Sequence, residues 1–112
     1  MMSLEQHTDT DRPAHELAKS ALRTTLLSEC LGRENAMSGK ELAAQTPVSS
    51  STIRDLIGEL RREEHIPVYS LGQGYFVIRT SEEFEACINR IDDEIETRQE
   101  TKRQLYNAVT GK

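Results

Sequence analysis

The chain has 112 residues, with two Phe, three Tyr and no Trp, and nineteen acidic against fourteen basic residues give it a net charge of −5. A chain of this length is expected to form one small domain whose core is mainly Leu, Ile, Val and Ala. The acidic balance argues against a protein held to nucleic acid by bulk charge alone, and the lack of a long apolar run argues against a membrane span. We therefore expect a cytoplasmic protein with no membrane partner.

The N-terminal segment divides into a polar tail and a helix. Residues 1–10 are polar and aperiodic, so a disordered tail is expected there. A helix is expected to begin near Asp11, with Pro13 in its first turn, where the missing N–H costs nothing. Leu17, Leu22 and Leu26 recur at helical spacing, and Gly32 is a natural stop signal.

Two further helices follow in close succession. Ser38 and Glu41 form a capping-box pattern that predicts a short helix near residues 39–46. Ser49 is the expected N-cap of a helix over residues 50–64. At 100° per residue, that helix should bury the stripe Ile53, Leu56, Ile57 and Leu60, and its opposite side should carry Ser51, Asp55, Gly58 and Arg62, with Arg54 on the flank.

The C-terminal part begins with a hairpin and ends with a long helix. The runs "IPVYS" and "YFVIR" are rich in β-formers, and the "LGQG" between them predicts a turn. Thr80 and Glu83 then form a second capping pattern that opens a helix over residues 81–110. Its seam alternates steps of four and three residues: Phe84, Ile88, Ile91, Ile95, Arg98, Lys102, Leu105 and Val109.

Two capped helices separated by "TPVS" and followed directly by a hairpin make a winged helix-turn-helix pattern. "SGKELAAQTPVSSSTIRDLIGELRRE" resembles the winged helix-turn-helix domains of bacterial, archaeal and viral transcription regulators. "HIPVYSLGQGYFVIRTSEE" resembles the wing and following helix of small stand-alone winged-helix proteins of phages and prophages. The resemblance implies a mainly α fold with a small β-hairpin: a DNA-binding domain over residues 11–80 and a long C-terminal helix over 81–110.

The helix over residues 50–64 suits the DNA major groove, where side chains near a helix N-terminus meet base edges or phosphates. Arg54 is the expected base-reading residue, with the option of a bidentate bond to guanine. Ser49 fits an N-cap better than a contact, and Asp55 would repel phosphate unless it accepts from a cytosine amine. The candidate DNA-binding residues are Lys40, Ser49, Ser50, Ser51, Thr52, Arg54, Asp55, Arg62 and Gln73.

Two features leave alternatives open. Gly58 costs about 1 kcal/mol of helix propensity relative to alanine, so something is expected to approach that face closely, either the DNA backbone or another helix. The wing tip carries Gln73 but no Lys or Arg, so it fits the structural end of a sheet as well as a minor-groove contact.

The long C-terminal helix is expected to pair two copies of the chain, because a domain this small rarely needs such a helix for its own core. The expected dimer contacts are Phe84, Ile88, Ile91, Ile95, Leu105 and Val109. Arg98 and Lys102 interrupt the apolar seam, and both parallel and antiparallel pairing remain open.

No sequence motif indicates catalysis, a metal site, a cofactor or a domain for a small-molecule effector. The favoured hypothesis is a homodimeric regulator, acting as a repressor, that binds specific sequences in double-stranded DNA. The alternatives are a winged-helix module that binds another protein, which the acidic balance and Asp55 favour, and a replication or excision accessory protein of a mobile element.

Overall fold

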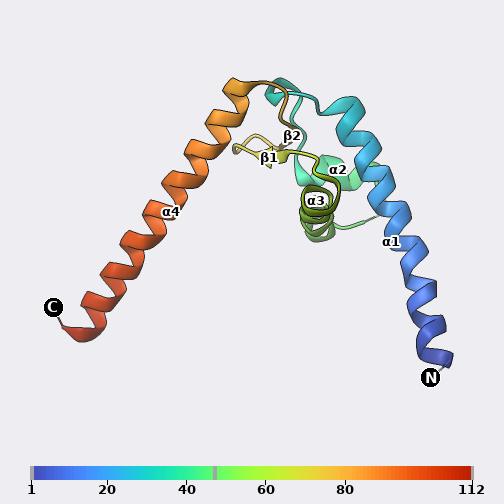
Figure 1. The fold of residues 1–112 in the computed structure, drawn as a ribbon, viewed down its shortest axis with the longest axis horizontal. Coiled ribbons are helices and arrows are strands. Elements are labelled where there is room, and N and C mark those ends of the chain that lie inside the picture. Colours follow the sequence, from blue (N-terminus) through green and yellow to red (C-terminus); the bar gives the residue numbers. More distant parts are fainter. Residues whose placement is uncertain (1, 47, 112) are drawn as a thin grey trace. The chain divides into compact units, whose positions relative to one another are not determined.

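The computed structural model of the chain describes residues 2–46 and 48–111, with the side chains of residues 2–12 left out of the description (Figure 1). It consists of two compact units, Met1–Arg79 and Thr80–Lys112. The first contains three α-helices, a 3-10 turn and a two-stranded hairpin, and the second is a single helix. The expected fold class, mainly α with a small hairpin and a long C-terminal helix, is confirmed.

Helix α1 (Met2–Glu29) starts earlier than the sequence indicated. Its backbone is helical from Met2 onward, and Pro13 lies inside the helix rather than in its first turn. Residues 2–12 contain neither glycine nor proline, and the helix continues through Pro13 although proline has no N–H to donate within the helix.

Helices α2 (Gly39–Gln45) and α3 (Ser50–Glu64) begin where their caps place them. The predicted capping box is present: the Glu41 N–H donates to Ser38 Oγ at 3.1 Å, and the Ser38 N–H donates to Glu41 Oε1 at 2.9 Å. Helix α3 ends at His65, which adopts a left-handed conformation (φ 55°). Residue 47, which lies in the connection between the two helices, is outside the described residues.

The hairpin pairs β1 (Val68–Ser70) with β2 (Tyr75–Val77) in antiparallel register, with Tyr69 opposite Phe76. Strand β2 also bonds on its other edge, a feature the sequence did not predict. Met37 exchanges two backbone hydrogen bonds with Tyr75, and Val77 bonds to the segment that follows α1 through the Cys30 carbonyl and the Gly32 N–H. A 3-10 turn, η1 (Arg33–Asn35), joins these two crossing points.

The core of the first unit lies where α1, α2, α3 and the hairpin meet. All four residues predicted on the inner stripe of α3 are at most 1% exposed, which confirms that prediction. They pack with apolar residues from each other element: Leu22 and Leu26 of α1, Leu42 of α2, and Val68 and Val77 of the strands. This packing orients α3, because burying one stripe of a helix dictates which side faces solvent.

The second unit is helix α4 (Ser81–Thr110). The Thr80 hydroxyl accepts a hydrogen bond from the Glu83 N–H at 3.1 Å, and Gly111 ends the helix in a left-handed conformation. Most of its apolar seam is exposed, including Phe84, Ile95 and Leu105.

Candidate nucleic-acid interface

The N-terminus of α3 is formed by three consecutive serines and a threonine. Ser49 Oγ accepts a hydrogen bond from the Thr52 N–H at 3.3 Å, so Ser49 is the N-cap, as expected. The same oxygen lies 3.1 Å from Ser51 Oγ and 3.0 Å from Thr52 Oγ1. These contacts draw the hydroxyls into one cluster at the positive end of the helix dipole, which is an environment that favours an anionic group.

The solvent-facing side of α3 has mostly small side chains and few charges. Ser50, Ser51, Arg54, Asp55 and Arg62 are all exposed, whereas Thr52 is half-buried. The exposed side therefore presents two guanidinium groups and one carboxylate together with hydroxyl groups. Asp55 remains the one acid among the predicted contacts on this helix.

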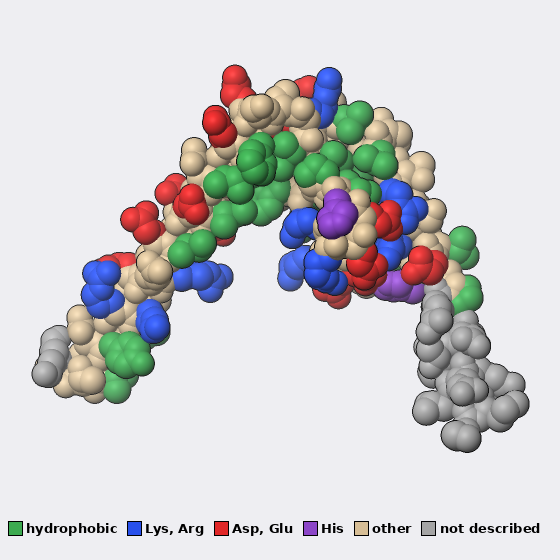
Figure 2. Space-filling view, viewed as in Figure 1, with side chains coloured by type: hydrophobic (Ala, Val, Ile, Leu, Met, Phe, Trp, Pro, Cys, Tyr) green, Lys and Arg blue, Asp and Glu red, His purple; other side chains and the backbone are tan. Residues whose placement is uncertain are grey.

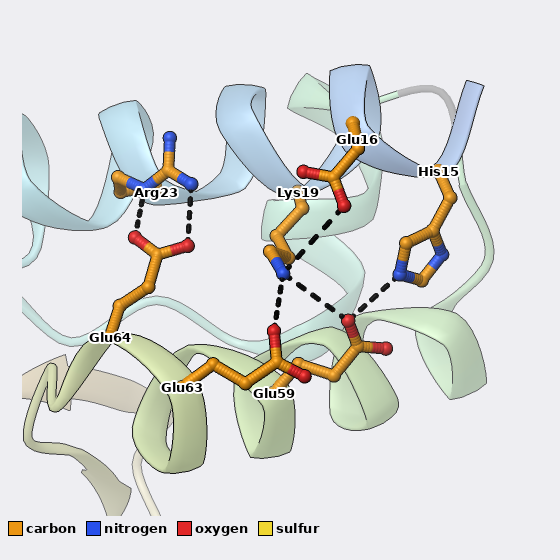
Figure 3. Close-up of polar contacts among 7 residues, drawn as sticks. All are labelled: His15, Glu16, Lys19, Arg23, Glu59, Glu63 and Glu64. Atoms are coloured by element: carbon orange, nitrogen blue, oxygen red, sulfur yellow. Dashed lines mark hydrogen bonds and ion pairs between the residues drawn. The ribbon is translucent and has the colours of Figure 1, made fainter. Parts of the chain in front are cut away.

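The other acids of α3 turn away from that side and meet α1. Arg23 donates two hydrogen bonds to Glu64, both at 2.6 Å, in a bidentate arrangement (Figure 3). Lys19 Nζ lies 2.8 Å from Glu63 Oε1 and 3.5 Å from Glu59 Oε1. His15 Nε2 lies 2.8 Å from the same Glu59 oxygen. We call these contacts, with His15, Lys19 and Arg23 on one side and Glu59, Glu63 and Glu64 on the other, the α1–α3 charge ladder.

The ladder changes the acidity of its members. The hydrogen bond from His15 lowers the pKa of Glu59, and the hydrogen bonds from Arg23 lower the pKa of Glu64. The hydrogen bond to Glu63 raises the pKa of Lys19. Each shift favours the charged form, so both carboxylates and the ammonium stay ionised at neutral pH.

Sequence reasoning missed the ladder, although a signal for it exists. His15, Lys19 and Arg23 are spaced four residues apart, and so are Glu59 and Glu63. Residues four apart share one face of a helix, so the chain contains a basic stripe and a shorter acidic stripe. Their opposite signs are the clue that the two helices lie side by side.

Gly58 faces open space on the exposed side of α3. A Cβ atom at this position would meet only the Nη1 atom of Arg62, at 3.4 Å, among the described residues. Within the first unit, no other helix approaches this glycine closely. Of the two explanations that the sequence left open, packing by another helix of that unit is therefore unsupported.

Arg61 and Arg62 are neighbours in the sequence, but their side chains have different surroundings. Arg61 donates from Nε and Nη2 to the Val68 carbonyl oxygen, at 3.1 and 2.9 Å, and so ties the end of α3 to the first strand of the wing. Arg62 is exposed on the same side as Asp55. Only Arg62 was predicted as a DNA contact, and that role stays a prediction.

The remaining predicted contacts lie at the edges of the unit. Lys40 is exposed in the first turn of α2, and Gln73 is exposed at the wing tip. Next to it, Gly74 has a φ of 128°, and a Cβ atom there would lie 2.6 Å from the Met37 carbonyl carbon. The wing tip is thus held against the start of α2 by a close backbone approach that only glycine permits.

Two kinds of feature are absent from the described residues. In that part of the chain, no group of three or more His, Cys, Asp or Glu residues is arranged to hold a metal ion. No helix there is long and apolar enough to cross a membrane.

A short helix, a capped second helix and a hairpin directly after it are the arrangement of the winged form of the helix-turn-helix DNA-binding domain. The family comparison agrees, since residues 23–76 match the family model described as "HTH domain". The chain therefore carries a helix-turn-helix DNA-binding domain, as the sequence resemblance implied. Comparisons with curated proteins and with solved structures gave no match.

Proposed function

We propose that this protein is a transcription regulator that binds specific sequences in double-stranded DNA as a homodimer and represses by occupying an operator. The family match supports DNA binding by a helix-turn-helix domain. Four parts of the proposal go beyond the family match: the preference for a specific DNA sequence, the repression, the dimer and the action in the cytoplasm.

The observation that carries the proposal is the separation of charge on α3. The carboxylates of Glu59, Glu63 and Glu64 are held by bases of α1, and the exposed side keeps Arg54 and Arg62 against Asp55 alone. The overall charge of −5 therefore does not describe the surface that would meet DNA. A local surface with excess positive charge can approach phosphates on an acidic protein.

In this proposal α3 lies in the major groove. Arg54 reads a base, and Ser50 and Ser51 bond to phosphate or base edges near the helix N-terminus. Ser49 and Thr52 hold that end of the helix in place. Lys40 and Arg62 bind phosphates, Gln73 bonds in the minor groove, and Asp55 accepts from a cytosine amine. The α4 seam, made of Phe84, Ile88, Ile91, Ile95, Leu105 and Val109, joins the two copies.

The test is selection of bound duplexes from a random library, at about 50 and about 200 mM salt, with light scattering on the same sample. An enriched palindrome, weaker binding at the higher salt and a dimeric mass are the expected results. Repression is then tested by placing the recovered site over a promoter and measuring transcription with and without the protein. No enrichment at either salt concentration would contradict sequence-specific DNA binding.

Exposed Asp55 and the net charge of −5 favour one second candidate, a winged-helix module that binds another protein through the same side of α3. A library that yields no enriched sequence, together with specific capture of a partner that Arg54→Ala abolishes, would favour this candidate.

A further inference from the structure

The seam of α4 is exposed over nearly its whole length. Phe84 and Ile95 are about half exposed, and Leu105 and Val109 are 61% and 85% exposed. At a rise of about 1.5 Å per residue the helix is about 45 Å long, so the seam is long enough for a partner helix to cover. Exposed apolar residues repeating in steps of four and three residues are the pattern by which one helix pairs with another.

The charges of α4 are distributed unequally along its length. The first part, residues 81–96, has seven acidic residues and one basic residue, whereas residues 97–110 have three basic residues and one acidic residue. Figure 2 shows this division: acidic side chains gather over the N-terminal part of α4 and basic side chains over its C-terminal part. The helix is therefore negative at one end and positive at the other.

This asymmetry distinguishes the two ways in which two copies of α4 can pair. A parallel, in-register pair places each seam residue beside its own copy, so that Arg98 meets Arg98 and Lys102 meets Lys102 within the apolar seam. It also places the acidic part of one helix along the acidic part of the other. Like charges in such close contact oppose association.

We propose that α4 binds α4 of a second copy of the chain in antiparallel orientation, in the register that covers the whole seam. This proposal rests on the homodimer in the proposed function and adds the orientation and register of the partner. Phe84 lies opposite Val109 of the second copy, and Ile88 lies opposite Leu105. The two-fold axis passes between Glu96 and Thr97, midway along the seam.

The same register accommodates the two bases that interrupt the seam. Lys102 lies level with Ile91 of the second copy, and Arg98 lies level with Ile95. The acidic residues that flank the seam at this level are Asp92 and Glu94, so each base has its apolar stem on isoleucine and its charge near a carboxylate. Arg98 and Lys102 therefore select the antiparallel dimer, because the parallel pair leaves them beside their own copies.

Cysteine cross-linking of the full-length chain tests the orientation. In a background with Cys30→Ala and Cys87→Ala, chains with Ile88→Cys are mixed with chains of different mass that carry Leu105→Cys. The antiparallel pair predicts a mixed dimer on oxidation. It predicts no dimer of Ile88→Cys alone, because two copies of position 88 lie about 25 Å apart along the axis, beyond disulfide reach. An efficient Ile88→Cys homodimer that excludes the mixed dimer would overturn the proposal.

A second measurement leaves both native cysteines in place. Arg98→Glu with Lys102→Glu should weaken dimerisation at least about tenfold, because these positions then face Asp92 and Glu94 of the partner. Adding Asp92→Lys and Glu94→Lys to the same chain should restore the dimer, with the helicity of both variants checked by circular dichroism. In a parallel pair positions 98 and 102 meet their own copies, so the first change only replaces two like positive charges with two like negative ones. A dimer that is not weakened by the first change, or not restored by the second, would overturn the proposed orientation.

The outcomes separate this proposal from the one on which it rests. A monomeric wild-type chain by light scattering contradicts both the homodimer and its orientation, whereas DNA selection with the same sample reports on DNA binding independently. A dimer that cross-links in the parallel manner contradicts the orientation alone.

Discussion

Lys19 Nζ lies 2.8 Å from Glu63 Oε1, although the two residues are 44 positions apart in the sequence. The Lys19 side chain is only 7% exposed, and its ammonium group also lies 3.5 Å from Glu59. One lysine of α1 therefore holds two carboxylates of α3, and this contact helps to keep acidic charge on the side of α3 that faces α1.

Replacing Lys19 should affect stability and DNA binding together. Lys19→Met keeps most of the side-chain volume but leaves Glu59 and Glu63 without their lysine, so we expect a lower melting temperature. We also expect DNA binding to weaken by roughly three- to tenfold, because the negative charge of the two carboxylates is then no longer neutralised near the DNA-binding helix. The measurements are a thermal melt and a binding titration on the selected duplex. Lys19→Arg is the matched control and should retain most of the stability and most of the DNA affinity. If Lys19→Met has the melting temperature and DNA affinity of the wild type, the α1–α3 charge ladder contributes to neither.

The free energy of unfolding should fall as the solution is made acidic. In the folded protein, the hydrogen bonds from His15 and Arg23 lower the pKa values of Glu59 and Glu64. A carboxylate whose folded pKa lies below its unfolded pKa contributes stability that is fully present above the unfolded pKa and is lost as pH falls through the folded pKa. Urea unfolding between about pH 7 and about pH 3 measures this loss.

The control for the acid effect is the double variant Glu59→Gln with Glu64→Gln. It should be less stable than the wild type at neutral pH and should lose less stability on acidification, because its two amides do not titrate. Parallel pH profiles for the two proteins would mean that other carboxylates govern acid unfolding.

Gly58→Ala should separate folding from DNA binding. The new Cβ atom meets only Arg62 Nη1, at 3.4 Å, so alanine should stabilise the helix by about 0.5–1 kcal/mol in chemical denaturation. If the DNA backbone approaches this glycine, affinity for the selected duplex should fall at the same time. A variant that is more stable and binds DNA equally well would show that the glycine has no role at the interface.

The stability of the wing should depend more on Gly74 than on Gly72. Both glycines have positive φ values, 128° and 104°, but a Cβ atom at Gly74 would also collide with the Met37 backbone, whereas nothing lies within 4 Å of one at Gly72. We expect Gly74→Ala to cost at least about 2 kcal/mol of unfolding free energy, from both left-handed strain and the collision. Gly72→Ala is the matched control for strain alone, and equal losses would contradict a role for the close approach.

Arg54 and Arg62 should differ in what they contribute to binding. Arg54→Ala should relax discrimination at one base position and cost about 1–3 kcal/mol on the preferred duplex, whereas Arg62→Ala should weaken all sequences by a similar factor and reduce the salt dependence. Binding of a set of single-base variants of the selected duplex measures both effects. An equal loss on every sequence for Arg54→Ala would assign it to a phosphate instead.

The sequence by itself determined the features that depend on neighbours along the chain. Ser38 with Glu41, Ser49 with Thr52, and Thr80 with Glu83 are three residues apart, so their caps were predictable from local chemistry. The buried stripe of α3 was predictable too, because 3.6-residue periodicity places Ile53 and Leu60 on one face whatever packs against it. The start of α1 is the local exception, since residues 2–10 have a polar composition but a helical backbone.

Only the tertiary structure decided which residues meet across the chain. The partners His15 and Glu59, Arg61 and the Val68 carbonyl, and Gly74 and Met37 come from different elements. The charged stripes indicate that α1 and α3 meet, but spacing along the chain does not show which residues pair. The α1–α3 charge ladder places Glu59, Glu63 and Glu64 toward α1, while Arg54 and Arg62 stay in solvent. The composition shows an acidic protein, but packing one helix against another determines where that acidity is exposed, because burial and ion pairing are properties of the assembled unit.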